Sequence, residues 1–153
     1  MAQIQQATSS DVPILLPLVK DYWNFEGIRG FDSKGVAEQL ERLLSDSNLG
    51  GGWIAFEEGA AVGYLFAVYV FSLEHLGVTA EIDELFVIPQ QRGQGVGQAL
   101  LKTAESVFER AGYTNISLQL SCGNDFARHF YHRQGYIERS GYELLEKMLH
   151  GGQ

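Results

Sequence analysis

The sequence predicts one α/β domain with a mixed sheet, in the element order β-α-α-β-β-β-α-β-α-β-β. Three observations support this fold class. Three segments have apolar residues at helical spacing and a fourth starts at a capping asparagine, about seven segments have strand character, and a glycine-rich turn joins a strand to a helix near the middle of the chain. No linker, repeat or low-complexity tract interrupts the 153 residues. We therefore expect one domain over 1–150 and a short tail at 151–153.

The first half of the chain is predicted to contain a short strand and two helices. Strand character covers 3–7, and the capping side chains of 8–11 precede apolar residues at helical spacing, which predicts a helix over about 11–24. Residues 25–31 have two glycines and no period, which indicates a loop. A second helix begins at Asp32 and closes in a turn over 46–52.

The second half is predicted to contain most of the sheet. Strands are expected over 53–57, 61–71 and 80–88, with a hairpin turn between the first two. A helix over 96–111 stops at Gly112, and a strand follows over 116–121. Asn124 can cap a last helix to about 134, and two further strands are expected over 136–139 and 142–149.

Composition and charge limit the function classes. The formal net charge is −8, whereas a nucleic-acid surface needs a clustered basic footprint. The longest apolar run, 60–71, is too short to span a membrane, and the first residues lack the pattern of a signal peptide. The single cysteine, Cys122, fits a reducing compartment, so we expect a cytoplasmic protein without nucleic-acid or membrane partners.

The most informative segment is the glycine-rich turn that follows the strand ending near Ile88. Gly93, Gly95 and Gly97 let the backbone approach an anion and adopt positive φ, and the free amides of the next helix point to the same place. Arg92 adds a cation. A Rossmann fingerprint and a nucleotide-triphosphate loop both fit poorly, because the glycine spacing differs and no lysine follows until Lys102.

The turn resembles the acyl-CoA binding motif of the GNAT superfamily of N-acyltransferases, Q/R-x-x-G-x-G/A. Two overlapping frames satisfy it, Gln90-Gln-Arg-Gly93-Gln-Gly95 and Arg92-Gly-Gln-Gly95-Val-Gly97. A second segment, from Asn124 to Tyr136, is similar to that family's N-x-x-A-x-x-F/L-Y-x-x-x-G-F/Y. The element order is also that of the GNAT fold, so the resemblance implies a mostly antiparallel mixed sheet of about seven strands flanked by four helices.

The resemblance implies an N-acetyltransferase that uses acetyl-CoA as co-substrate and needs no metal. Pantetheine would bind backbone groups of Phe86 and Val87, and Asn124 would either cap its helix or contact CoA. Tyr131 matches the family's usual general acid, and a phenol suits protonation of a thiolate. The pyrophosphate would bind the turn, whose residues are Arg92, Gly93, Gln94, Gly95, Val96 and Gly97.

Three acids precede the pantetheine segment and are candidates for the general base. Strand alternation would put Glu84 on one face with Ile82 and Phe86, and Glu81 and Asp83 on the other, whereas a β-bulge would reverse this assignment. A half-buried carboxylate is costly unless it is paired or functional. We favour Glu84, then Asp83, and the alternative is three solvated acids along the edge of a cleft.

In the family, the loop between the first two helices lines the acceptor pocket. Trp23, Phe25 and Glu26 are therefore the candidate substrate-binding residues, although their aromatic rings would equally well pack the two helices together. The acid surplus favours a cationic acceptor, which would be a small-molecule amine or a peptide amine. An acyl-cysteine at Cys122 and a metal at His129 and His132 are weaker readings.

Two alternatives to this function stay open. One is a CoA-binding regulatory or degenerate domain without turnover, and the other is an acyltransferase that uses a different acyl-CoA or acceptor. A homodimer is possible by analogy with the family.

Overall fold

The computed structural model of the chain describes residues 1–150 and has two compact units, Met1–Gln119 and Leu120–Gln153. The predicted tail at 151–153 lies outside the described residues. The expectation of one domain over 1–150 stays a prediction.

The first unit contains a five-stranded mixed sheet with the strand order β1-β2-β3-β4-β5. Neighbouring strands are antiparallel except β4 and β5, which are parallel. The strands are β1 (Gln3–Gln6), β2 (Gly50–Glu57), β3 (Ala60–Ser72), β4 (Gly77–Val87) and β5 (Ile116–Leu118). The mixed α/β class predicted from the sequence is confirmed.

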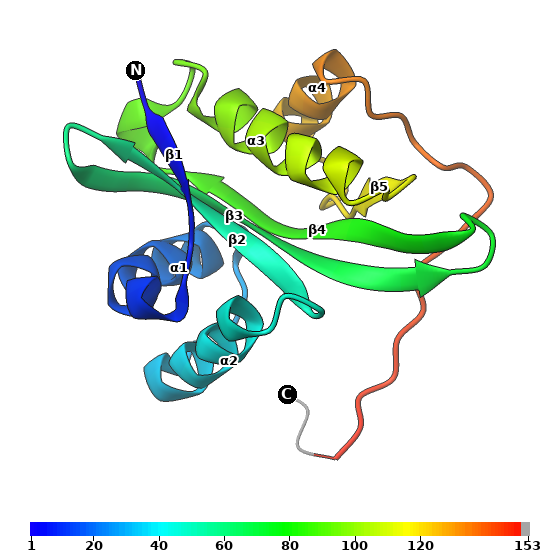
Figure 1. Cartoon of the computed structure of the whole chain (residues 1–153), viewed down its shortest axis with the longest axis horizontal. Coiled ribbons are helices and arrows are strands. Elements are labelled where there is room, and N and C mark those ends of the chain that lie inside the picture. The colour runs from blue at the N-terminus through cyan, green and yellow to red at the C-terminus, as the bar shows by residue number, and fades with distance from the viewer. Residues whose placement is uncertain (151–153) are drawn as a thin grey trace. The chain divides into compact units, whose positions relative to one another are not determined.

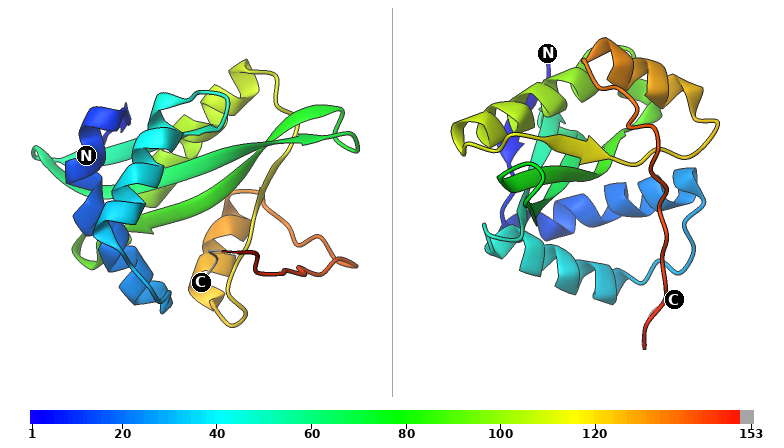
Figure 2. Two further views of the ribbon diagram at one scale, coloured as in Figure 1. Left: turned by 90° about the horizontal axis from the view of Figure 1, so that it is seen from below. Right: turned by 90° about the vertical axis from the view of Figure 1, so that its right-hand side faces the viewer.

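Helices cover both faces of this sheet, as Figures 1 and 2 show. On one face lie α1 (Val12–Glu26) and α2 (Ser33–Ser45), and on the other lies α3 (Val96–Arg110). Short 3-10 turns, η1 (Ser9–Asp11) and η2 (Pro89–Gln91), precede α1 and the glycine-rich turn. The three helices lie where the apolar periodicity predicts them, with ends displaced by one or two residues.

The apolar stripes of α1 and α2 meet the sheet in a continuous core. Leu15, Leu18 and Val19 of α1 and Leu40 of α2 are buried with the sheet residues Ile54, Tyr64, Phe66 and Phe86. α1 ends because Gly27 adopts φ +72°, a left-handed conformation that favours glycine. The predicted loop therefore starts two residues later than expected, and Phe25 and Glu26 belong to the helix.

The predicted turn over 46–52 is shorter in the structure, because β2 already begins at Gly50. A Cβ at Gly50 would collide with the carbonyl oxygen of Ala67, and a Cβ at Gly52 would lie 2.8 Å from Leu44 Cδ2. The glycines that read as a turn are needed for close packing in a strand.

A β-bulge interrupts the pairing of β3 with β4. Phe66 faces Glu84, but the next residue of β3, Ala67, faces Ile82, so Asp83 is an extra residue in β4. Glu84 therefore lies on the α1 and α2 face, and Ile82 lies on the opposite face. The expectation that Glu84 shares a face with Ile82 is wrong, because simple alternation does not hold across a bulge.

The second unit contains the predicted fourth helix, α4 (Asp125–Arg133), with Asn124 as its N-cap. The side-chain oxygen of Asn124 accepts a hydrogen bond from Ala127 N at 3.1 Å. The capping predicted for Asn124 is confirmed.

The two strands predicted over 136–139 and 142–149 are wrong, because neither segment forms a strand in the structure. Tyr136 N instead donates to Tyr131 O at 3.0 Å and closes α4, and Gly141 makes a turn with φ +88°. Apolar alternation identifies a segment that can form a strand, but a strand also needs a neighbouring strand to pair with its backbone. The described sheet therefore has five strands rather than about seven.

Candidate functional site

The carboxylate of Glu84 is the centre of the candidate site. Trp23 Nε1 donates to its Oε2 at 3.1 Å, and the Tyr64 hydroxyl donates to its Oε1 at 2.8 Å. Burial raises the pKa of Glu84 to about 7, although both hydrogen bonds favour the charged form and act in the opposite direction. A carboxyl group with this pKa can accept a proton at neutral pH, as a general base must.

Tyr64 was not identified from the sequence. Burial, reinforced by the neighbouring Glu84 carboxylate, raises the pKa of Tyr64, so its hydroxyl stays protonated and acts as the donor. The sequence has no signal for this contact, because the bulge at Asp83 decides which residues of β3 and β4 share a face.

The other two candidate acids differ from Glu84. Asp83 has an exposed side chain, although partial removal from water raises the pKa of its carboxyl above the usual range. Glu81 lies in the stretch of β4 that pairs with β5, and its carboxylate accepts a weak hydrogen bond from Gln119 Nε2 at 3.4 Å. Glu84 combines a pKa raised to about 7 with two hydrogen-bond donors that fix its position.

A pocket of about 440 Å³ lies beside Glu84, between α1, α2 and the sheet. Its volume falls in the range of small-molecule sites. It combines three carboxylates with apolar walls, and it is lined by Val19, Trp23, Gly30, Asp32, Gly35, Val36, Gln39, Leu40, Leu43, Phe66, Asp83 and Glu84. None of these residues is a lysine, arginine or histidine.

Only one of the three candidate substrate-binding residues of α1 lines this pocket. Trp23 lines the pocket, and its ring also packs against Phe31 with 5.4 Å between ring centroids. The packing role considered for this tryptophan is therefore present, whereas its role in substrate binding stays a prediction. Phe25 and Glu26 are not among the residues that line the pocket, and Phe25 contacts Arg92 and Phe86 instead.

The glycine-rich turn has the conformation that an anion site needs. Gly93 has φ +75° and Gly95 has φ +84°, and no heavy atom lies within 4 Å of a Cβ built on either residue. Gly95 is the N-cap of α3 and has no capping side chain, so the first amides of the helix are free of side-chain caps. Gly97 lies inside α3, which begins at Val96. The positive φ predicted for Gly97 is wrong, because its backbone is already helical.

The other turn residues occupy supporting positions. Val96 is buried at the start of α3, and Gln94 Nε2 donates weakly to Gln90 O at 3.4 Å. Arg92 Nε donates to Val87 O at 2.8 Å and so fixes the arginine against the end of β4.

Within the described residues, the end of β4 before the turn pairs with β3 but not with β5. The ladder between β4 and β5 covers residues 80–82, while β4 continues to Val87. Phe86 and Val87 pair with Tyr64 and Gly63 of β3 on the other side. Their position fits the backbone contacts to pantetheine that the resemblance implies.

Tyr131 and Asn124 belong to the second unit. Tyr131 is 8% exposed, and its ring makes edge contacts with Phe130 and Tyr136 at centroid distances of 5.1 and 5.5 Å. Burial raises the pKa of its hydroxyl, which therefore stays protonated at neutral pH. A proton donor needs this state, and a packing tyrosine has it as well.

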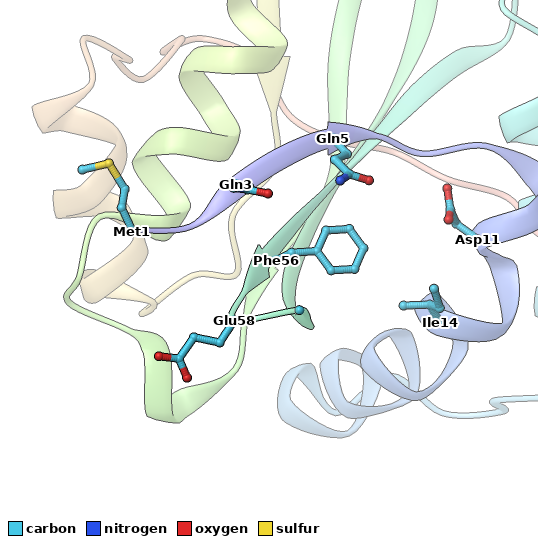
Figure 3. Close-up of a pocket in the computed structure, with 8 residues that line it drawn as sticks. Met1, Gln3, Gln5, Asp11, Ile14, Phe56 and Glu58 are labelled. Carbon is cyan, nitrogen blue, oxygen red and sulfur yellow. The ribbon is translucent and has the colours of Figure 1, made fainter.

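Figure 3 shows a second pocket in the first unit, of about 500 Å³. Its walls come from β1, the start of α1 and the turn between β2 and β3, and it shares no residue with the pocket beside Glu84. Its lining residues are Met1, Gln3, Gln5, Asp11, Ile14, Phe56, Glu58 and Gly59.

The hypotheses of an acyl-cysteine at Cys122 and of a metal at His129 and His132 gain no support from the geometry. Within residues 1–150, no three side chains of His, Cys, Asp or Glu gather where they could hold a metal ion. His132 instead lies 2.7 Å from the carboxylate of Glu138, and Cys122 is an exposed free thiol. Each helix in the described part of the chain is too short or too polar to cross a membrane.

Known proteins resemble this chain over almost its whole length. The chain is 30% identical over 139 residues to the uncharacterized N-acetyltransferase YhfO of Bacillus subtilis, which covers 91% of this chain and 92% of that protein. It is 29% identical over 136 residues to the aminoalkylphosphonate N-acetyltransferase of Salmonella typhimurium, which covers 89% of this chain and 85% of that enzyme.

Solved structures have the same fold. An integron cassette protein from the mobile metagenome of Cole Harbour Salt Marsh superimposes with a TM-score of 0.85 and 28% identity, over 96% of this chain and 90% of that protein. A predicted acetyltransferase from Clostridium acetobutylicum, solved with acetyl-CoA, superimposes with a TM-score of 0.81 and 20% identity, over 95% of this chain and 96% of that protein.

The family model described as the acetyltransferase (GNAT) family matches residues 16–136, well over half of the chain. This match includes the pocket, the glycine-rich turn and the Tyr131 segment. The chain is an acyltransferase that belongs to the acetyltransferase (GNAT) family.

Proposed function

We propose that this enzyme transfers the acetyl group of acetyl-CoA to a primary amine by direct attack of the amine on the thioester. The observation that carries the proposal is Glu84, a carboxyl group with a pKa near 7 in the wall of a pocket of substrate size. Acceptor amines are mostly protonated at neutral pH, so a base in this pocket supplies what the reaction needs.

The donor half of the proposal depends on the glycine-rich turn. Pyrophosphate would bind the first amides of α3 near Gly95, where two glycines leave the backbone open. The pantetheine arm would run along the end of β4 at Phe86 and Val87, beyond the stretch that pairs with β5. The family match and the related fold solved with acetyl-CoA support this donor.

The reaction further needs a general base, an oxyanion donor and a general acid, and each of these three has a candidate group. Glu84, through a water molecule, takes the proton of the acceptor ammonium, and the free amine then attacks the thioester carbon. The amide of Val87 would donate to the oxyanion of the tetrahedral intermediate. The carbon–sulfur bond breaks, Tyr131 gives its proton to the departing thiolate, and the second proton lost by the attacking nitrogen restores the Tyr131 hydroxyl. Products are the N-acetylated amine and CoA.

The acceptor is proposed to be a cationic amine with no anionic group. Three carboxylates line the pocket beside apolar walls, and no basic residue is among the lining residues. An anionic substituent would therefore face acids without a counter-charge. The Salmonella relative is named for aminoalkylphosphonates, so charge is a property in which the two pockets are expected to differ.

Other expectations also remain proposals. The match over 16–136 includes parts of both compact units, which supports a single acyltransferase domain. We also propose a cytoplasmic location from the composition and a homodimer by analogy with the family.

A thiol-release assay tests the proposal directly. Wild type, Glu84→Gln and Tyr131→Phe are mixed with acetyl-CoA and a panel of monoamines, diamines, aminophosphonates and lysine peptides. We expect turnover with at least one amine and a loss of about 10²- to 10⁴-fold in each variant, with CoA affinity unchanged. Binding of CoA without turnover of any amine would favour a degenerate CoA-binding domain, and faster turnover with longer acyl-CoA donors would favour another acyltransferase.

A further inference from the structure

Phe25 is a large aromatic residue in an unexpected place. It lies in the last turn of α1, and 59% of its surface is exposed, so burial of its own ring does not explain its position. One face of the ring contacts the guanidinium of Arg92, whose Cζ lies 4.6 Å from the ring centroid. This distance is typical of a cation–π interaction.

Arg92 is held by three different contacts. Besides the contact with Phe25, its Cζ lies 5.5 Å from the centroid of the Phe86 ring, and its Nε donates to Val87 O at 2.8 Å. The two rings also contact each other, with 6.4 Å between their centroids. A guanidinium has five N–H donors, so the bond to Val87 engages one and leaves the Nη donors for other partners.

This arrangement reduces the cost of binding an anion. An arginine side chain has about 2 kcal/mol of rotamer entropy, and much of it is lost when the guanidinium is fixed before a ligand arrives. Arg92 directly precedes Gly93 and Gly95, whose backbone forms the open end of the turn. A guanidinium fixed at this point belongs to a residue only a few positions before the amides that would receive phosphate.

We propose that Phe25 is a positioning residue that holds Arg92 ready for the phosphates of the donor. The inference rests on the proposed function, because the anion is the pyrophosphate of CoA. It assigns Phe25 to the donor side of the site, whereas its neighbour two residues earlier, Trp23, lines the acceptor pocket. The last turn of α1 therefore contributes one aromatic residue to each side.

A double-mutant cycle on CoA affinity tests this assignment. The dissociation constant of CoA is measured by calorimetry for wild type, Phe25→Leu, Arg92→Gln and the double variant. Loss of a partly exposed cation–π contact is expected to weaken binding about two- to fivefold in Phe25→Leu. The same change in the Arg92→Gln background is expected to have no effect, because Phe25 acts only through Arg92.

Two further variants separate positioning from general structure. Phe25→Tyr retains an aromatic face and is expected to bind CoA as wild type does. Phe71→Leu makes the matched change at another exposed phenylalanine, in β3, and is expected to leave CoA affinity unchanged. Melting temperatures report whether each variant is folded.

The outcomes are distinguishable. Equal weakening by Phe25→Leu in both backgrounds, or no weakening in either, would overturn the role of Phe25 while CoA still binds to wild type. Failure of wild type to bind CoA would instead overturn the proposed function and this inference with it.

Discussion

Removal of the Trp23 hydrogen bond should shift the pH dependence of the reaction. The indole N–H donates to Glu84 at 3.1 Å and so favours the ionised carboxylate. In Trp23→Phe this donor is lost while an aromatic ring remains. The pKa of Glu84, already raised to about 7 by burial, must then rise further.

The size of the shift follows from the strength of such bonds. A hydrogen bond to a charged group contributes about 1.5 kcal/mol, and this corresponds to about one pKa unit. At pH 7 about half of the Glu84 carboxyls are ionised in wild type, and about a tenth would be ionised in the variant. The rate at pH 7 is therefore expected to fall about fivefold, whereas the plateau at high pH is retained.

The measurement is kcat/KM for the acceptor between pH 5.5 and about 9.5, a range that covers about two units on each side of the expected titration. Rates are corrected for the free-amine fraction of the acceptor, because the substrate titrates as well. Tyr64→Phe removes the second donor to Glu84 and should shift the acidic limb in the same direction.

Tyr69→Phe is the matched control. It removes a hydroxyl from the same strand, but its ring packs against Phe108 and Tyr113 rather than against Glu84. An acidic limb that stays in place in Trp23→Phe and Tyr64→Phe, or that moves equally in Tyr69→Phe, would refute Glu84 as the titrating base.

Three further predictions concern the turn, the pocket and the stability of the fold. Gly95→Ala forces a side chain into φ +84° and should destabilise the protein by about 1–2 kcal/mol in urea unfolding, whereas Gln94→Ala next to it should have little effect. Asp83→Asn should raise KM for a diamine up to about fivefold, whereas Glu81→Gln should not, because Glu81 is not among the residues that line the pocket. Equal effects of the two variants on KM would argue against the acidic pocket as the acceptor site. The pKa of Glu84 is higher in the folded state than its ordinary 4.5, so ionisation costs stability as pH rises from about 4.5 to about 7. Glu84→Gln should therefore raise the melting temperature at pH 8, and the free energy of unfolding should rise by at most about 3 kcal/mol. The gain should vanish near pH 4, whereas a gain that is the same at every pH would point to a cause other than ionisation.

Much of the fold could be predicted from the sequence, because the helical segments have clear apolar stripes and punctuating glycines. α1, α2 and α3 form where the periodicity predicts them, and α4 forms after the Asn124 cap. Strands are harder to predict from the sequence, since a strand depends on a neighbouring strand that the local pattern does not identify. The segments 136–139 and 142–149 have the composition of strands and do not form them.

The donor side of the site could be read locally. Gly93, Gly95 and the start of α3 are adjacent in sequence, so one motif specifies the backbone conformation and the helix end together. Gly97 shows the limit of this approach. Alternating glycines suggest a common conformation, but the helix has already begun at Val96.

The acceptor side depends on contacts between distant residues. Glu84 could be chosen as the candidate base from its position ahead of the segment proposed to bind pantetheine, but Trp23 is 61 residues and Tyr64 is 20 residues away along the chain. Their bonds to one carboxylate require the register of β3 on β4 and the packing of α1 on the sheet. The bulge at Asp83 fixes this register, and no residue type in the segment indicates a bulge.

The same bulge explains the raised pKa for which Glu84 is proposed as the base. By placing this carboxyl on the face covered by α1 and α2, it removes the group partly from water and raises its pKa toward neutrality. A solvated carboxylate at the edge of the sheet would cost nothing in stability, but with an ordinary pKa it would be a weak base at neutral pH. Burial without donors would leave the ionised form uncompensated, and Trp23 and Tyr64 limit that cost. The site therefore gives up folding stability above about pH 4.5 in exchange for basicity at pH 7.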